Sequence, residues 1–404
     1  MKNKKWYVVV IVVILLLLVT NATTFIVANG MSIALGDKII VKTEDAATTE
    51  YINKLLYLKD EIQASYYKDV EDQSLLDGAI KGMFEAVGDP YTAYYDADQF
   101  QAYMEQVQGS YVGIGVVVGL NEDNKVTVVS AIDGSPGKKA GLLSGDLIVK
   151  VNGDDVTGLN LEQVVSKIKG DAGTSVVLEI EREGSAKLIE KEITREEIVL
   201  NSVDSMLLED NIGYITITQF ETNTAKEFKE HLNKLQSANI KGLILDVRDN
   251  PGGMMDTVVQ IVDQLIGESV IVYTEDKAGK KETMSSEEKS KIDLPMVVLI
   301  NEGSASASEI FAGALQDTGA ATIVGATSFG KGIVQRMSDL NDGTGYKITV
   351  SEYFTPNGRN IHGKGIEPDV PVEMSQKARY EADFDLKDDV QLNKAIEVMK
   401  EKMK

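Results

Sequence analysis

Between about residues 198 and 370 the chain alternates apolar stretches of strand length with stretches of helical spacing. The candidate strands are 213–217, 242–247 and 296–300, and the candidate helices are 225–236, 256–266 and 306–316. Such alternation is typical of a layered α/β core in which helices cover a sheet. We therefore expect an α/β domain here, interrupted by a charged and mobile insertion at 275–293.

The chain ahead of this core divides into a helical region and a β-rich module. Apolar residues recur at helical spacing up to a stop at Gly88, Asp89 and Pro90. Short apolar runs and glycine turns follow, and they predict strands at 115–118, 126–129, 147–151 and 175–181 and a helix at 161–169. The predicted segments are an apolar terminus at 1–30, helices at 31–95, the β-rich module at 96–194, the core at 195–375 and a helical tail at 376–404.

Composition narrows the possible functions. The 404 residues exceed what one hydrophobic core usually serves, and 43% apolar with 26% charged residues is ordinary globular composition. A net charge of −22 argues against nucleic acid as a partner, because proteins bind nucleic acids through basic patches. The absence of cysteine excludes disulfides, thiolate zinc sites and a cysteine nucleophile. With only His231 and His362 available, we expect no metal and no cofactor.

The N-terminus predicts a membrane segment. Lys2, Lys4 and Lys5 precede a strongly apolar stretch, and residues 6–28 would cross the ~30 Å hydrocarbon core as a helix. The lysines would stay in the cytoplasm, which leaves the chain after about residue 30 outside as the extracytoplasmic part of a single-pass protein. A cleaved signal peptide is the alternative, although 26–28 is a poor small-x-small cleavage site.

A serine-rich turn is the most informative segment. Residues 296–300 form a buried strand candidate, and the small residues that follow open a helix near Ser306. A serine at that junction would lie at a helix N-terminus, where free N–H groups stabilise a developing oxyanion. The alternative is that these serines only cap the helix.

A lysine between two glycines supplies a candidate base. Lys331 could accept a proton only if burial or a nearby positive charge lowers its pKa. Gln335 would lie beside Lys331 in a helical turn, whereas in a straight strand the two would be ~13 Å apart. A solvated loop is the alternative for Gly330, Lys331 and Gly332.

Two glycine-containing turns complete the candidate sites. Gly252 and Gly253 follow the strand candidate at 242–247 and could direct a backbone N–H toward the serine's target, unless they form an ordinary strand-to-helix turn. A glycine-rich loop of the β-rich module could hold a peptide's terminal carboxylate, while the strand edge adds the peptide as a further strand. That candidate peptide site consists of Tyr111, Val112, Gly113, Ile114, Gly115 and Val116.

The β-rich module resembles a PDZ domain, and the chain as a whole resembles the C-terminal processing (tail-specific) serine peptidases. The likeness covers about residues 40 to 375 and includes 89–94, 246–253, 303–309, 330–335, 355–359 and 365–369. The resemblance implies a mixed α/β, crotonase-like protease core. It also implies that Ser306 is the nucleophile, that Lys331 is the general base and that Gln335 orients it. The backbone of Ala307, with that of Gly252 or Gly253, would form the oxyanion hole.

The same resemblance implies a function. The protein would cleave substrates near unstructured, apolar C-termini, with the PDZ domain capturing the tail and gating the active site. It also favours a homodimer, in which helical segments at both ends of the chain pair between subunits. The alternative is a membrane-anchored PDZ scaffold that binds C-termini without cutting them.

Overall fold

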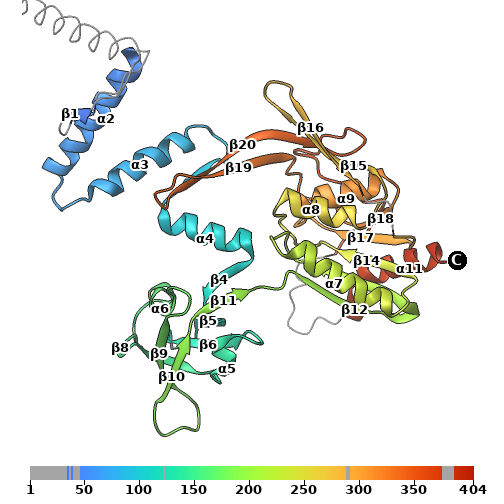
Figure 1. The fold of residues 1–404 in the computed structure, drawn as a ribbon, viewed down its shortest axis with the longest axis horizontal. Helices are drawn as coiled ribbons and strands as arrows, with labels where there is room; N and C mark the ends of the chain where they lie inside the picture. Colours follow the sequence, from blue (N-terminus) through green and yellow to red (C-terminus); the bar gives the residue numbers. More distant parts are fainter. Residues whose placement is uncertain (1–33, 36–37, 40–45, 122, 288–291, 375–385) are drawn as a thin grey trace, which may run out of the picture. The chain divides into compact units, whose positions relative to one another are not determined.

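The computed structural model describes residues 34–35, 38–39, 46–121, 123–287, 292–374 and 386–404. The chain divides into a unit that ends at Ala86 and a unit from Val87 to Lys404. The described part of the first unit contains the short strands β1 (Ala34–Leu35) and β2 (Lys38–Ile39) and the helices α2 (Ala46–Ser65) and α3 (Asp72–Glu85) (Figure 1).

The predicted membrane segment at 6–28 lies outside the described residues. Within the described part of the chain, no helix combines the length and the apolar composition needed to span a bilayer.

The β-rich module is a twisted sheet with strand order β10-β9-β7-β6-β5, and β8 pairs with β7. Its strands are β5 (Val116–Leu120), β6 (Val126–Ala131), β7 (Leu147–Val151), β8 (Asp154–Asp155), β9 (Ser175–Glu181) and β10 (Ile189–Thr194). Helices α5 (Pro136–Lys139) and α6 (Leu161–Ile168) accompany them. Strands β7 and β9 coincide with the predicted ranges, because both are largely apolar runs bounded by glycine turns.

A two-stranded ribbon leads into and out of this module. Strand β4 (Ser110–Gly113) pairs antiparallel with β11 (Glu196–Val199). Helix α4 (Ala97–Gln108) precedes β4 and ends at Gly109, whose left-handed conformation (φ 67°) stops the helix.

The main sheet of the core has strand order β12-β13-β14-β17-β18-β21. Its strands are β12 (Val203–Leu207), β13 (Ile212–Ile217), β14 (Gly242–Asp246), β17 (Met296–Ile300), β18 (Ala321–Gly325) and β21 (Val370–Pro371). From β13 onward neighbouring strands are parallel, and every residue of β14 and β17 is buried. Parallel strands that are covered on both faces consist of continuous apolar runs. Such runs are easy to recognise in a sequence, which is why β14 and β17 were predicted close to their observed bounds.

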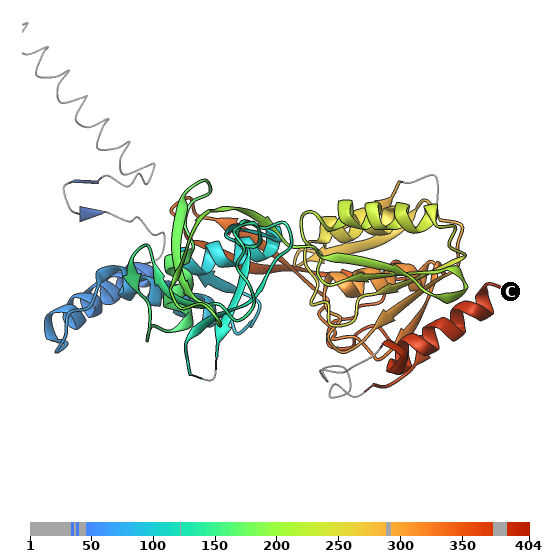
Figure 2. The same ribbon diagram turned by 90° about the horizontal axis from the view of Figure 1, so that it is seen from below.

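Helices cover both faces of this sheet. Residues of α7 (Thr224–Ser237), α8 (Met255–Asp263) and α9 (Ala307–Asp317) share one hydrophobic core with one face, and α11 (Val390–Lys402) packs in a separate core on the other. Figure 2 shows the C-terminal helix on the side opposite α7 and α8. The α/β layering of the core is therefore as predicted.

A second sheet of the core has strand order β16-β15-β20-β19, with β3 (Ala93–Tyr95) added to β20. The other strands are β15 (Ser269–Asp276), β16 (Lys281–Ser286), β19 (Ile333–Asp339) and β20 (Gly345–Phe354). The prediction of a mobile insertion at 275–293 is wrong over its described first part, because residues 281–286 form a hairpin with β15. The helical turn considered for Gln335 is also wrong, since that residue lies in β19.

Candidate active site

Ser306 lies at the sharp turn between β17 and α9, immediately before the first helical residue, Ala307. Its backbone has φ 53° and ψ −113°, a strained conformation for a residue with a side chain. Two side chains hold it: the N–H donates to Glu309 Oε2 at 2.8 Å, and the hydroxyl of Tyr353 donates to the Ser306 carbonyl at 2.9 Å. The same carbonyl also accepts the backbone N–H groups of Glu309, at 2.8 Å, and Ile310, at 3.1 Å. The surroundings therefore fix a conformation that the serine alone would avoid.

Glu309 joins the serine turn to the lysine loop. Its carboxylate is fully buried, and Oε2 accepts the backbone N–H of both Ser306 and Lys331, each at 2.8 Å. Oε1 accepts the Ser328 hydroxyl at 2.6 Å and the Gly330 N–H at 2.7 Å. Because one rigid carboxylate binds both segments, the backbones of Ser306 and Lys331 are held in a fixed relation.

Lys331 has the environment that a lysine base needs. Burial is the largest cause that lowers its pKa below the ordinary 10.5, and the positive charge of Lys347 lowers it further. Asp89 and Glu309 act in the opposite direction. Its ammonium group lies 4.5 Å from the centre of the Tyr91 ring, and among the described residues it forms no ion pair with a carboxylate.

Gln335 reaches the same cavity from β19, but not as the helical spacing implied. Its side-chain N–H donates to the Ile333 carbonyl at 3.4 Å, and no hydrogen bond joins it to Lys331 within the described part of the structure. Gln335 therefore lines the cavity from a strand, while the orienting contact with Lys331 that the resemblance implies stays a prediction.

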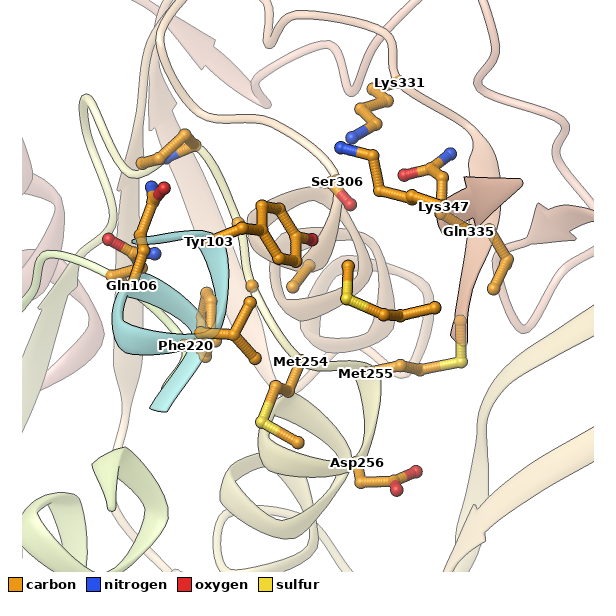
Figure 3. A pocket seen from close by; sticks show the side chains of 18 of the residues that line it. Tyr103, Gln106, Phe220, Met254, Met255, Asp256, Ser306, Lys331, Gln335 and Lys347 are labelled. Carbon is orange, nitrogen blue, oxygen red and sulfur yellow. The ribbon is translucent and has the colours of Figure 1, made fainter. Parts of the chain in front are cut away.

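Ser306, Lys331 and Gln335 line a single cavity of about 770 Å³. Figure 3 shows these side chains gathered at one side of it, together with Lys347. Much of the remaining lining is apolar and comes from several elements: Phe220, Met254, Met255, Ile310, Val334 and Met337. Helix α4 adds Tyr103.

The glycine turn lies against the serine turn. A side chain on Gly252 would come within 2.9 Å of Ser306 Cβ and 3.0 Å of the Ala307 nitrogen. The Gly252 N–H already donates to Asn250 Oδ1 at 2.8 Å. Gly253 forms a parallel bridge with Phe220, made by the Gly252 carbonyl and the Met254 N–H, so its own N–H faces away from that partner. Of the two glycines, Gly253 is therefore the better candidate for the second oxyanion donor.

The predicted peptide site divides into two parts. Tyr111, Val112 and Gly113 belong to β4, whose ladder partner is β11, so they are not the free edge of the module's sheet. The sheet has edge strands at β10 and β5, and the one next to the predicted site is β5, which begins at Val116. Ile114 and Gly115 form the connection between them, and Gly115 adopts φ 68°, with Ser135 too close to allow a side chain.

Two further side chains line the cavity, and the sequence analysis identified neither as a candidate site residue. Tyr103 and Lys347 line the cavity, but they come from α4 and β20, far from the serine and lysine motifs. No local motif marks either residue. Within the described residues, no group of three or more histidine, aspartate or glutamate side chains could hold a metal ion.

Comparison with known proteins identifies the family. Sequence models match peptidase family S41 at residues 211–372, a PDZ domain at 127–182 and the N-terminal domain of the activating protease CtpB at 17–99. The carboxy-terminal processing protease CtpA of Bacillus subtilis is 39% identical over 359 residues, covering 88% of this chain and 77% of that protein. The chain belongs to the carboxy-terminal processing proteases of family S41.

Two further proteins are similar to this chain. CtpB of Bacillus subtilis is 37% identical over 334 residues, covering 82% of this chain and 69% of its own. A crystal structure of a Bacteroides fragilis protein assigned to the S41 proteases shares the fold, with a TM-score of 0.51, 14% identity and coverage of 85% and 97% of the two chains. The predicted serine peptidase with a PDZ domain is thus confirmed, and its substrates are proteins.

Proposed function

We propose that this S41 protease cleaves proteins near their C-termini by a Ser-Lys mechanism. Neutral Lys331 takes the proton of Ser306 Oγ, which attacks the peptide carbonyl. Lys331 then passes this proton to the nitrogen of the scissile bond, the C–N bond breaks, the C-terminal fragment leaves as an amine, and an acyl-enzyme remains. The N–H groups of Ala307 and Gly253 stabilise the oxyanion, and Gln335 orients the lysine. Water then releases the acyl group with the help of the same base. The observation that carries this proposal is the Glu309 carboxylate, which binds the backbones of both Ser306 and Lys331 beside one cavity.

We further propose that the PDZ domain delivers the substrate. An unstructured tail would add to the free edge of β5 as another strand, and the Ile114–Gly115 connection would bind its terminal carboxylate. Val117 lies on that strand with 47% of its surface exposed to solvent, so it offers an apolar contact along the edge. Tail binding would also shift the protein from a blocked to an open state. Deleting the module should then remove tail-dependent activation.

The apolar N-terminal segment supports a place at the membrane. We propose that residues 6–28 anchor the protein and that the PDZ and protease domains act outside the cytoplasm. A homodimer is also proposed, with helices of the N-terminal unit as the contact. Apolar Tyr51, Leu55 and Tyr67 of that unit are exposed, as expected of helices that pair with a second copy.

The test uses the purified full-length protein as wild type, Ser306→Ala and Lys331→Ala. Each protein is incubated with an unfolded substrate that ends in small apolar residues, and with the same substrate ending in a charged tail. Mass spectrometry sizes the fragments. Cleavage by wild type alone, faster with the apolar tail, is the expected result.

Two other outcomes would change the proposal. Cleavage by Lys331→Ala at the wild-type rate would remove the lysine from the mechanism. Binding of the apolar tail without cleavage by any of the three proteins would favour the membrane-anchored PDZ scaffold instead.

A further inference from the structure

A second lysine lies in the cavity beside the candidate base. Lys347 comes from β20, and its side chain lines the same cavity as Ser306 and Lys331. Figure 3 shows the amino groups of Lys331 and Lys347 pointing toward one another. An ammonium group in a partly buried cavity normally has a carboxylate partner. Among the described residues, Lys347 forms no ion pair with one.

Aromatic rings hold Lys347 in place of a carboxylate. Its ammonium group lies 4.9 Å from the centre of the Tyr103 ring and 5.8 Å from that of Tyr95. The two rings stack on each other at 5.3 Å, so they form a continuous support from α4 and β3. Ring faces attract a cation without neutralising it. Lys347 can therefore present its full positive charge to the cavity.

The groups that face Lys331 have opposite effects on its charge: some favour the charged form and others the neutral form. Asp89 and Glu309 favour its charged form, and the face of Tyr91 does so as well. Burial opposes them, and so does the charge of Lys347. Asp256 and Asp339 also line the cavity, but neither forms an ion pair with Lys331 or Lys347 in the described part of the chain. Lys347 is thus the cation that counteracts the two carboxylates.

We propose that Lys347 is a positioning residue for the peptidase reaction, whose positive charge keeps Lys331 in the neutral form that accepts the proton of Ser306. This inference rests on the proposed Ser-Lys mechanism. In this proposal the two lysines of the cavity have different roles: Lys331 accepts the proton, and Lys347 provides the positive charge beside it.

The test compares wild type, Lys347→Met and Lys347→Arg as full-length proteins. The kcat/KM for an unfolded substrate with an apolar tail is measured from pH 6 to pH 10. Loss of the charge in Lys347→Met should move the acidic limb of the profile to higher pH. A displacement of one pH unit lowers kcat/KM on that limb about tenfold, with recovery toward wild type at high pH. Lys347→Arg should keep the wild-type profile, because its guanidinium stays charged.

Lys281→Met is the matched control. Lys281 also lies over a tyrosine ring, 5.0 Å from the centre of Tyr273, in the same sheet but outside the cavity lining. Its removal should leave the pH profile unchanged. Lys347→Gln serves as a second neutral variant if Lys347→Met unfolds, which thermal unfolding detects.

Several results would overturn the inference. One is a neutral Lys347 variant whose profile falls by the same factor at every pH. Another is a neutral Lys347 variant that is inactive throughout while Lys331→Met still cleaves, since Lys347 would then be the base. If wild type cleaves, Ser306→Ala does not and the neutral Lys347 variants have unshifted profiles, this inference alone fails. If wild type and Ser306→Ala behave alike, the proposed mechanism fails with it.

Discussion

Ser306 illustrates how much of this active site depends on the conformation of a single residue. Its φ of 53° is unfavourable for a serine, and the bonds from Tyr353 and to Glu309 hold it there. Tyr353 also donates its own N–H to the Gly332 carbonyl, next to the candidate base. The hydroxyl of one buried tyrosine therefore supports the candidate nucleophile, while its backbone N–H supports the lysine loop.

Removing only that hydroxyl should weaken catalysis. Tyr353→Phe deletes the hydrogen bond to the Ser306 carbonyl and keeps the ring in the core. A loss of about 1 kcal/mol in positioning would lower kcat/KM roughly five- to tenfold. Steady-state kinetics and urea unfolding are measured together. Tyr214→Phe is the control, because it removes another buried hydroxyl bond, to Asp246 at 2.6 Å, on the opposite face of the main sheet. Equal activity losses in both variants would contradict a specific role for Tyr353.

The lowered pKa of Lys331 also has a consequence for stability. Between that lowered value and the ordinary 10.5, the unfolded chain binds more protons than the folded protein. The folded state therefore loses stability as pH falls from about 10.5, and the loss is complete below the folded pKa. Lys331→Met removes this penalty and should stabilise the protein at pH 7, with a gain that shrinks as pH rises toward 10.5.

Urea unfolding at pH 6, 8 and 10 checks this expectation. Both proteins carry Ser306→Ala, so that neither can degrade itself during the measurement. A lysine variant less stable than its parent at pH 6 would show that burial of Lys331 is not costly.

At the scale of elements, the C-terminal helix α11 is fastened to the main sheet by a buried charge cluster. Arg248 donates to Asp246 at 2.6 Å and pairs with Asp389 at 2.8 Å, and all three side chains are buried. Asp389 also caps α11 by accepting the N–H groups of Gln391 and Leu392. Arg248 lies in the turn that continues to Gly252 and Gly253, so the cluster connects the tail helix with the candidate oxyanion turn.

Asp389→Ala should therefore destabilise more than a surface change on the same helix. It leaves the Arg248 guanidinium with one buried carboxylate and removes the helix cap, at a cost of about 3–5 kcal/mol. Urea unfolding gives the free energy, and hydrogen exchange reports on the amides of α11. Glu397→Ala, which breaks only the exposed pair with Lys394, is the control and should change little. A small effect of Asp389→Ala would mean that α11 does not depend on the cluster.

The elements also show what the sequence could and could not predict. Strands β7, β9 and β17 were predicted with their observed bounds, because buried apolar residues and glycine turns define them locally. The hairpin strand β16 was missed, since four of its six residues are exposed and polar or charged and leave no apolar pattern. The turns that carry Ser306 and Lys331 stand out in the sequence, but only the resemblance to the family singled out these two residues, and their roles stay predictions. The position of Lys347 could not be predicted, because only the pairing of β20 with β3 and the packing of α4 bring it onto its aromatic support in the cavity.

At the scale of the whole molecule, the PDZ module and the protease core have separate hydrophobic cores. The module's core includes Leu178 and Ile180, and the protease core includes Leu245 and Phe311, each fully buried. The two sets share no residue. The ribbon of β4 and β11 joins them.

Destabilising one core should therefore leave the other largely intact. Leu178→Ala leaves a cavity in the PDZ core and should cost about 2–5 kcal/mol there. Calorimetry of the full-length chain should show one transition moving to lower temperature. Leu245→Ala should move the other transition instead. A single transition that shifts equally in both variants would show that the two cores unfold as one unit.

The pairing of β3 with β20 joins residues 93–95 to residues 345–347, on either side of the PDZ module. Thr349 strengthens this junction by donating to the side chains of Thr92 and Asp89, at 3.1 Å and 2.6 Å. A ribosome makes the chain from its N-terminus. Strand β3 and Tyr103 of α4 therefore lack their partners on β20 until most of the chain has been synthesised. The candidate catalytic cavity cannot be complete before residue 347 emerges, because Lys347 lines it. If the proposed mechanism holds, the growing chain therefore lacks a finished peptidase site for most of its synthesis.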